Sequence, residues 1–521
     1  MLAAIKEKVR NHNLVKIALS DPASSAIFQI ALPVLSFLIY YLTLSPGVFG
    51  FDSAELATGV FTWGIIHPPG YPLYLILGKI FSFLPFGDLA YRLNLMSAFF
   101  AALTTLVNYR ILKLLAINNL VAAAGACIFA FSNYYWQMSV VAEVYTLHVF
   151  LLSLSLYVIL LWRKKGNDKN LLSFSFLFGL SFSSHTSSIL FFPGFFWLIV
   201  TCKHWNWRKW KIYLPVSVFF IIGLLPYLYL PLRALANPAL NYSNYYNVDL
   251  TSWAGFWWMI SGKAYHFFAF SYPLDKVPTE LYIFIRFLFR NYLGVGFIVG
   301  LIGLYLYVRK NTQEAFGLLL IFLGNVIFYL NYQVADKDTM FLPAFFIWSI
   351  FIAYGISRIL PWIISLVDES ALAKYVRSAL YSFLLFIILF TVLINWQWVD
   401  LSNSSGPRIF AEEVLNNVEP NSIILAKWSP AVVLEYYQIV QNMRPDIDII
   451  NRSRIEVAEY YHLNELGMTP EYINAQIDQN EIDFLEQSIQ DRTVYIIEYE
   501  SLLSKHFKYI PVRNFFKLEP R

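Results

Sequence analysis

The chain has 521 residues, of which 58% are hydrophobic, 18% are aromatic and only 14% are charged. Soluble domains carry roughly a quarter charged residues, so this composition excludes an ordinary soluble protein and indicates a chain that spans a membrane. The formal net charge is +4. The basic residues stand in short clusters between apolar runs, which is typical of membrane topology and not of nucleic-acid binding. Cys127 and Cys202 both lie in apolar runs, which excludes a disulfide framework and a cysteine zinc site.

Apolar segments long enough to cross a bilayer recur along the first 400 residues. The first follows a basic N-terminus and lacks a small-residue cleavage site, so we interpret it as a retained span and not as a signal peptide. Segment 171–202 is too long for one span and breaks near 183–188, which predicts a hairpin of two short spans. The other segments are 27–44, 93–112, 120–136, 145–162, 211–230, 281–308, 315–331, 340–357 and 376–396, giving about eleven spans in all.

Lysine and arginine clusters flank these segments on one side only. They lie at Lys6, Lys8, Arg10 and Lys16 before the first span, and within 110–113, 163–165, 203–211, 309–310, 358 and 374–377 after later ones. The positive-inside rule assigns such clusters to the cytoplasm. The sequence therefore predicts a multi-pass protein of the plasma (inner) membrane with a cytoplasmic N-terminus.

Residues 401–521 have a different character, because they are mixed polar and contain no span. SIILAKW and DIDIIN are strand-like runs on either side of a plausible helix at 429–440, and TVYIIE is a further strand. An odd number of spans places this region outside the membrane, in the periplasm or the extracellular space. We thus expect an α-helical polytopic membrane region at 1–400 and a small extracytoplasmic α/β domain at 401–521.

A polar and aromatic stretch at 45–72 opens a first external loop at about 45–92. Asp52 and Glu55 are three residues apart and would share one face of a helix. His67 is followed at once by Pro-Pro-Gly-Tyr71-Pro, a turn with few backbone states that can fix a neighbouring histidine. Two carboxylates and a histidine just outside a span suggest chemistry at the bilayer surface. The alternative is a solvated loop with a helix N-terminus at Asp52.

Further polar residues are expected at the external ends of the spans. Glu143 stands at the outer mouth of the fourth span, and His185 at the outer turn of the hairpin, in FSSHTSS. Arg233 follows the seventh span, and Asp336 and Lys337 follow the ninth. Each of them alone could be a helix cap, an interface anchor or a charged turn. Their gathering on one face favours a functional site.

Several separated pieces of the chain resemble one family. They are FDSAELATGVFTWGIIHPPGYP, AEVY, LPLRALANPALN, DKDTMFLP and RPDIDIIN. Together they are similar to multi-spanning glycosyltransferases of the glycosyltransferase-C superfamily, in the family that includes the animal transmembrane O-mannosyltransferase acting on plexin-type receptors. Ala239 departs from the pattern, since a second proline is usual there. The resemblance implies the glycosyltransferase-C fold and inverting transfer of a hexose, with mannose expected, to Ser or Thr of exported proteins.

The external site has no access to cytoplasmic nucleotides, so the sugar donor is expected to be a polyprenyl-phosphate sugar. Asp52 is the candidate base, and Glu55 or Glu143 would orient the acceptor or the base. Arginine binds phosphate through a planar fork, so Arg233 or a lysine is expected to hold the donor phosphate. The remaining candidates for donor or substrate binding are His67, Tyr71, Lys79, His185, Asp336 and Lys337.

Two questions stay open at this point. Asp52 and Glu55 could instead hold a divalent metal, Mg or Mn, as the first-loop acid does in some relatives within the superfamily, and no other cofactor is expected. The acceptor could also be a lipid or a glycan instead of a protein.

A transporter or flippase is the main rival function, but such a protein would carry charges near mid-span and broken helices in paired halves. No nucleic-acid partner is expected.

Overall fold

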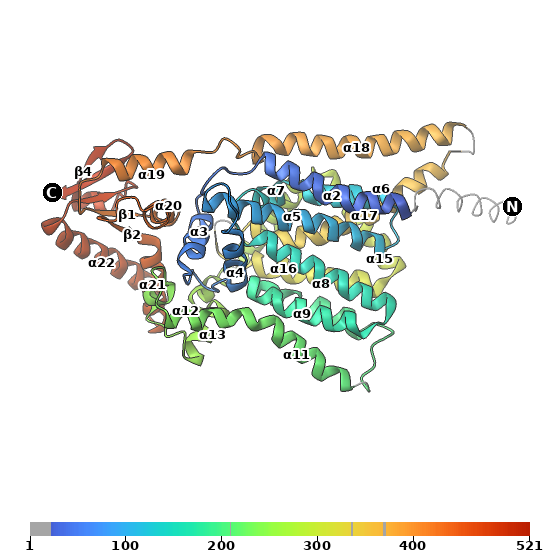
Figure 1. Ribbon diagram of the computed structural model, residues 1–521, viewed down its shortest axis with the longest axis horizontal. Coiled ribbons are helices and arrows are strands. Elements are labelled where there is room, and N and C mark those ends of the chain that lie inside the picture. Colours follow the sequence, from blue (N-terminus) through green and yellow to red (C-terminus); the bar gives the residue numbers. More distant parts are fainter. Residues whose placement is uncertain (1–21, 209, 335–336, 368–370) are drawn as a thin grey trace.

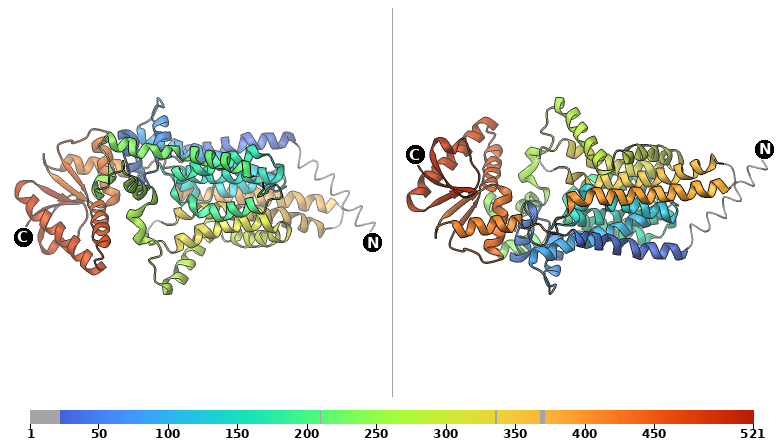
Figure 2. Two further views of the ribbon diagram at one scale, coloured as in Figure 1. Left: turned by 90° about the horizontal axis from the view of Figure 1, so that it is seen from below. Right: turned by 90° about the horizontal axis from the view of Figure 1, so that it is seen from above.

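A computed structural model describes residues 22–208, 210–334, 337–367 and 371–521. Long helices lie side by side in an elongated bundle, and a small β-sheet with its own helices stands beyond one end of that bundle (Figure 1). Both views of Figure 2 place the sheet at the same end, next to the blue and green segments that carry the short helices between the spans.

In the described part of the chain, seven helices are long and apolar enough to cross a membrane, or up to eight if a bent pair counts as one span. They are α2 (Pro22–Leu42), α5 (Leu89–Leu114), α8 (Tyr145–Lys165), α11 (Tyr213–Leu224) with its flanking turns, α16 (Thr312–Leu330), α17 (Leu342–Ser365) and α18 (Ala371–Val399). The protein is therefore a polytopic membrane protein. The number is lower than the expected eleven because some predicted spans are short helices.

These short helices occupy two of the predicted segments, 120–136 and 171–202. α6 (Asn119–Ala130) is followed by a separate α7 (Asn133–Ser139), where one span at 120–136 was expected. The hairpin at 171–202 is broken as predicted, with α9 (Asp168–Ser184) ending just before His185. The chain then continues as η1 (Thr186–Phe191) and α10 (Phe192–Val200).

The span predicted at 281–308 is bent into two helices. α14 (Val277–Asn291) and α15 (Val295–Lys310) meet at an angle of 101°. Leu293 and Gly294 have φ of 53° and 69°, in the left-handed region that ends a helix. α15 then packs closely on α17. A Cβ on Gly303 would lie 1.9 Å from the carbonyl oxygen of Phe351, so glycine is required at this contact.

Short elements at the end of the bundle carry the polar residues of the first external loop. α3 (Asp52–Thr62) and α4 (Pro72–Phe81) are joined by the Pro-rich turn, where Gly70 and Tyr71 have φ of 84° and 40°. Pro72 then occupies the first position of α4, which its fixed φ favours. η3 (Leu225–Leu228), α12 (Tyr229–Leu235), η4 (Tyr242–Tyr246), α13 (Trp253–Ser261), η5 (Lys263–Phe268) and η6 (Leu274–Lys276) follow the span that contains α11.

The C-terminal region folds as an α/β domain around a five-stranded sheet of order β2-β1-β3-β5-β4. α19 (Gly406–Asn417), β1 (Ile423–Ala426), α20 (Trp428–Ile439), β2 (Asp448–Asn451), α21 (Arg452–Glu465), α22 (Pro470–Asp491) and β3 (Val494–Ile496) come first. The predicted β-α-β order is observed, and β1 pairs in parallel with β2 and β3. The sequence did not predict the antiparallel pair β4 (Phe507–Val512) and β5 (Phe515–Pro520), with η8 (Leu503–Lys505) before it. α20 packs directly on α3.

Candidate functional site

His67 lies between the two carboxylates of α3. Its Nδ1 is hydrogen-bonded to Oε2 of Glu55, and its Nε2 is 3.7 Å from Oδ2 of Asp52. Asp52 is the first residue of α3 and Glu55 lies one turn further, so both reach the same side of the helix. The shared face predicted for Asp52 and Glu55 is therefore observed, and His67 lies against both carboxylates.

The two carboxylates differ in their access to solvent. The Glu55 side chain is fully buried, whereas the Asp52 side chain is 32% exposed. Burial by itself lowers the pKa of His67, but the charges of Glu55 and Asp52 and the hydrogen bond from Glu55 outweigh it and raise this pKa to about 9. His67 is thus a cation at neutral pH, held by two anions.

The C-terminal domain completes this cluster. Trp428, the first residue of α20, donates a hydrogen bond of 3.2 Å from Nε1 to Oδ1 of Asp52. Arg454 of α21 lies 4.0 Å from Oε1 of Glu55 through its Nη2. Residues of the first loop and of the last domain therefore form one site, although 376 positions separate Asp52 from Trp428.

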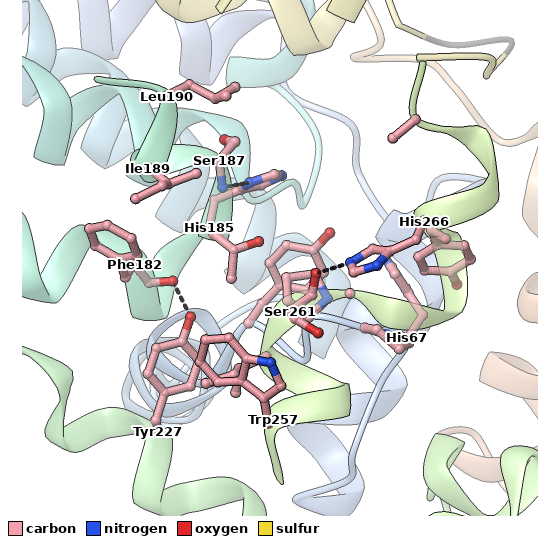
Figure 3. A pocket seen from close by; sticks show the side chains of 18 of the residues that line it. His67, Phe182, His185, Ser187, Ile189, Leu190, Tyr227, Trp257, Ser261 and His266 are labelled. Atoms are coloured by element: carbon pink, nitrogen blue, oxygen red, sulfur yellow. Dashed lines mark hydrogen bonds between the residues drawn. The ribbon is translucent and has the colours of Figure 1, made fainter. Parts of the chain in front are cut away.

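A cavity of about 1200 Å³ starts at Asp52 and His67 and runs into the bundle (Figure 3). Its polar end is lined by Asp52, His67, Tyr71, His185, Tyr242, Tyr265, His266, Trp428 and Ser453. Its apolar arm is lined by Phe182, Ile189, Leu190, Phe220, Ile221, Leu224, Leu225, Leu228, Phe256, Trp257 and Phe328, among others. In Figure 3, Phe182, Ile189 and Leu190 lie on the side of the cavity away from His67.

The apolar arm opens through the side of the bundle. Ile189, Ile221, Leu225, Leu228 and Trp257 line the cavity and are each half exposed or more. The span that contains α11 also has few buried residues, as expected for a helix that faces lipid. The cavity therefore connects a polar, charged end to an apolar opening on a membrane-facing side.

Two of the predicted binding residues line the cavity close to His67. The ring centroid of Tyr71 is 5.2 Å from that of His67 and 5.5 Å from that of His185. His185 accepts a hydrogen bond of 3.2 Å on Nδ1 from the backbone N–H of Ser187, so its other ring nitrogen is available to a ligand. The break between α9 and η1 thus places His185 at the cavity, where its ring also caps the turn. Its role in binding a phosphate or a sugar stays a prediction.

The predicted phosphate-binding cations have other partners, and none is among the described residues that line the cavity. Arg233 donates from Nε to the carbonyl oxygen of Trp63 at 2.7 Å, and Lys79 lies 5.4 Å from the centroid of the Trp63 ring. Lys337 is buried in an ion pair with Glu280. Each of these three side chains therefore has a partner within the protein, and its role in binding the donor phosphate stays a prediction. Asp336 lies outside the described residues.

Glu143 is buried between α7 and α8, and its backbone N–H donates to Oγ of Ser97 at 3.2 Å. Its charge makes the smallest contribution to the raised pKa of Tyr71, which burial and the charge of Asp52 raise most. Glu143 is not among the described residues that line the cavity. Its position therefore favours an indirect role over contact with an acceptor.

The residues present do not fit a divalent metal. Among the described residues, no group of three or more His, Cys, Asp and Glu side chains is arranged to hold one. Glu55 directs one oxygen to His67, and Asp52 directs one oxygen to Trp428. Protonated His67 occupies the space between the carboxylates where a metal would have to bind.

Sequence reasoning missed Trp428, Arg454, Tyr242 and Tyr265. Trp428 and Arg454 follow β1 and β2 closely. The carboxyl ends of parallel strands are where ligands bind in open α/β sheets, so the β-α-β pattern could have pointed to them. For the two tyrosines, which lie in the short helices η4 and η5, the sequence holds no comparable signal.

Comparisons with known proteins agree with this architecture. Residues 52–208 match the family described as Protein O-mannosyl-transferase TMEM260 N-terminal domain. The chain is 25% identical over 525 residues to Protein O-mannosyl-transferase tmem260 of Dictyostelium discoideum, covering 88% of this chain and 62% of that protein. It is 24% identical over 466 residues to Protein O-mannosyl-transferase TMEM260 of Mus musculus, covering 81% of this chain and 62% of that protein. The family resemblance inferred from the sequence pieces is therefore confirmed, although the chain spans less than two thirds of either relative.

The fold is shared with ArnT from Cupriavidus metallidurans. The crystal structure of ArnT bound to undecaprenyl phosphate superposes with a TM-score of 0.60 over 96% of this chain and 98% of ArnT, at 9% identity. The apo state of ArnT gives a TM-score of 0.58. At this identity the likeness concerns the fold alone, and it confirms the expected glycosyltransferase-C type of helical membrane fold.

Proposed function

We propose that this protein is a membrane glycosyltransferase that moves a hexose, with mannose expected, from a polyprenyl-phosphate donor to Ser or Thr of exported proteins. The observation that carries the proposal is the cavity that joins Asp52 and His67 to an apolar arm open at the side of the bundle. The names of the relatives from Dictyostelium discoideum and Mus musculus support a protein acceptor and mannose. ArnT, which has the same fold, was crystallised with undecaprenyl phosphate.

The shape of the cavity fits the two chemically different ends of such a donor. A polyprenyl chain would enter from the lipid through the apolar arm, past Ile221 and Leu225, and remain surrounded by apolar side chains. The phosphate and sugar would then lie at the polar end, near His67. Aromatic rings at this end, such as Tyr242 and Trp428, suit a hexose because they present apolar faces with polar edges.

His67 is the group that we assign to the donor phosphate. It is a cation that lines the cavity, whereas Arg233, Lys79 and Lys337 contact other parts of the protein. A fixed positive charge beside the phosphate stabilises the negative charge that develops when the sugar leaves. Glu55 keeps His67 protonated and correctly oriented, so it acts through His67 and does not touch the substrate.

Asp52 is the proposed general base. The acceptor hydroxyl oxygen attacks the anomeric carbon of the sugar, and its proton passes to Oδ2 of Asp52 as the new bond forms. The bond between the anomeric carbon and the phosphate oxygen breaks, and its electron pair leaves with the polyprenyl phosphate. Attack opposite to the leaving group inverts the anomeric configuration. No step requires a metal ion, in keeping with the side chains present.

The proposed function requires a particular orientation of the chain in the membrane. We place the N-terminus in the cytoplasm and the α/β domain outside, in the periplasm or extracellular space, with about eleven spans between them. The clusters of Lys and Arg at the other ends of the spans support this orientation. A reporter that is active only in the cytoplasm, fused after Arg521, is expected to be silent. An active fusion would place the site on the wrong side and overturn the proposed donor.

The direct test uses purified protein in liposomes, polyprenyl-phosphate mannose labelled in the sugar, and exported proteins from cells that lack this chain. We expect label on Ser and Thr of specific exported proteins, located by mass spectrometry. Label that moves only into a lipid or glycan fraction would support the second acceptor class. Label that crosses the bilayer while still attached to its lipid would support a flippase.

A further inference from the structure

Arg454 reaches from the C-terminal domain into the candidate transfer site. It lies three residues after Asn451, the last residue of β2, which caps α21 by accepting a hydrogen bond of 3.1 Å from the Arg454 backbone N–H. The Arg454 side chain is 1% exposed, and its Nη2 lies 4.0 Å from Oε1 of Glu55. This glutamate oxygen is buried and has no hydrogen-bond donor among the described residues.

The charge of Arg454 is compensated within its own domain. Nη1 and Nη2 each donate a hydrogen bond of 2.9 Å to one of the two carboxylate oxygens of Glu435. Such a planar, bidentate pair fixes the guanidinium more firmly than a lysine could. Because a buried charge is unfavourable without a partner, Glu435 allows Arg454 to stand beside Glu55 without depending on it.

Aromatic rings hold the same guanidinium from other sides. Its central carbon lies 5.2 Å from the ring centroid of Tyr242, 5.0 Å from that of Tyr245 and 5.8 Å from that of Trp428. Trp428 is also the residue that donates to Asp52. The α/β domain thus fixes both carboxylates of α3, Asp52 through Trp428 and Glu55 through Arg454.

We propose that Arg454 is a positioning residue of the transfer site, acting through Glu55 on His67, and that docking of the α/β domain completes this site. The inference rests on the proposed function for its catalytic consequence but not for its geometry. Glu55 lies between two cations, His67 and Arg454, so removal of Arg454 changes both the position of Glu55 and the electrostatic field at His67.

The positive charge of Arg454 lowers the pKa of His67, although burial and the two carboxylates have larger effects. Besides Arg454, the titratable groups that face His67 are Asp52, Glu55, Tyr71, His185, Tyr242 and Tyr265. Loss of the arginine charge is therefore expected to raise the pKa of His67 further. The alkaline limit of activity, where His67 loses its proton, should move to higher pH.

Arg452 offers a matched control in the same helix. It is also buried in an ion pair, donating from Nε and Nη2 to Glu481 and from Nη1 to Glu500. These carboxylates all belong to the α/β domain. Arg452→Gln therefore disturbs the domain as Arg454→Gln does, but it leaves the surroundings of Glu55 intact.

We expect Arg454→Gln to lower kcat about 10- to 100-fold, with a smaller change in donor KM, and to move the alkaline limb of the pH profile upward. Arg452→Gln should keep the alkaline limb of wild type. Arg454→Lys keeps the positive charge but loses the bidentate guanidinium. It should therefore leave the alkaline limb of the pH profile in place while kcat falls several-fold. A pH profile that moves equally in both glutamine variants, or full kcat in Arg454→Lys, would overturn the proposal.

A second measurement needs no substrate. The apparent melting temperature of the purified full-length protein is followed from pH 6 to pH 10. The decline in melting temperature that accompanies deprotonation of His67 should move to higher pH in Arg454→Gln and not in Arg452→Gln. If wild type transfers no sugar, the proposed function fails while this shift still supports the contact. If the melting temperatures of both variants decline at the same pH as that of wild type, the inference about Arg454 fails, whether or not the protein transfers sugar.

Discussion

Trp428 donates a hydrogen bond of 3.2 Å from its indole Nε1 to Oδ1 of Asp52. The bond joins the α/β domain to the first loop and fixes one oxygen of the carboxylate. The other oxygen, Oδ2, lies 3.7 Å from Nε2 of His67 at the polar end of the cavity. Asp52 is thus held in one orientation with one oxygen directed to the position where we place the acceptor.

Asp52→Asn is expected to abolish transfer without loss of the fold. Asparagine keeps an oxygen for the Trp428 donor but cannot take a proton, and a general base typically contributes about a hundredfold to ten-thousandfold in rate. We therefore expect kcat to fall by about that factor, with normal expression and normal donor binding, in an assay with labelled donor.

Asp88→Asn is the matched control, because Asp88 caps α5 by accepting a hydrogen bond from the backbone N–H of Tyr91. Asparagine caps helices equally well, so transfer should remain near that of wild type. If Asp52→Asn also transfers sugar at a near-normal rate, the base is another residue, and Glu143 becomes the next candidate.

Substitutions of His67 and Arg233 are expected to differ in their effect on donor binding. Hydrogen bonds to charged groups contribute about 1.5–3 kcal/mol, so His67→Gln should weaken binding of polyprenyl phosphate by about 10- to 100-fold. Arg233→Gln removes the bond to the Trp63 carbonyl but no cavity group, so it should change the Kd less than about threefold. Quenching of tryptophan fluorescence by the lipid would measure both. If Arg233→Gln weakened donor binding more than His67→Gln does, the phosphate-binding role would be assigned to Arg233.

The apolar arm can be filled by one substitution. Leu224 lines the arm at the end of α11, and a tryptophan there would occupy space needed by a polyprenyl chain. We expect Leu224→Trp to raise the donor KM about tenfold for a long-chain donor and less for a short one, since each buried CH₂ contributes about 0.8 kcal/mol.

Leu214→Trp serves as the control, because Leu214 is on the same helix, is 72% exposed and is not among the cavity residues. It should leave the KM unchanged in the same titration with donors of different chain length. Equal effects of the two tryptophans would mean that the chain does not enter this arm.

The apolar segments gave most of the helices correctly because a bilayer requires long apolar runs, which composition reveals. The break at His185 was predicted for a similar reason, since polar residues interrupted the run. The bend between α14 and α15 was missed because Leu293 and Gly294 form a turn inside an apolar segment. Hydropathy does not register such a change of direction.

The candidate site was predictable only where its members are close in the sequence. Asp52, Glu55 and His67 share one turn-helix unit, and the spacing of the two carboxylates implied their common face. Arg233 looked like a phosphate ligand because the sequence does not show that its Nε bonds a carbonyl 170 residues away. The β-α-β pattern points to the strand ends near Arg454, but the sequence does not show that the last domain docks on the first loop, so Arg454 was missed.

A chelator is expected to leave transfer unchanged. Glu55 bonds His67, and Asp52 bonds Trp428, so neither carboxylate is arranged as a metal ligand in the described structure. Protein purified with EDTA should keep full kcat, and added Mg²⁺ or Mn²⁺ should not raise it. Elemental analysis of the active protein checks this independently. Loss of transfer with EDTA that Mn²⁺ restores would show that the carboxylates rearrange around a metal.

The stability of the protein should depend on pH through His67. Its pKa is raised from 6.5 to about 9 in the folded protein, because Glu55 and Asp52 outweigh the effect of burial. A group whose pKa is raised on folding stabilises the protein fully below its unfolded pKa, near 6.5, and this contribution disappears as the pH rises through about 9. Each pKa unit corresponds to about 1.4 kcal/mol.

We therefore compare the apparent melting temperatures of wild type and His67→Gln between pH 6 and pH 10. Glutamine resembles neutral histidine in size and polarity but carries no charge, so wild type should be the more stable protein at pH 6, by several degrees. The difference should shrink through pH 9 and be smallest at pH 10. His506→Gln, at an exposed histidine of the α/β domain, should follow wild type throughout. A difference that stays constant or grows with pH would show that His67 is not held as a cation between Asp52 and Glu55.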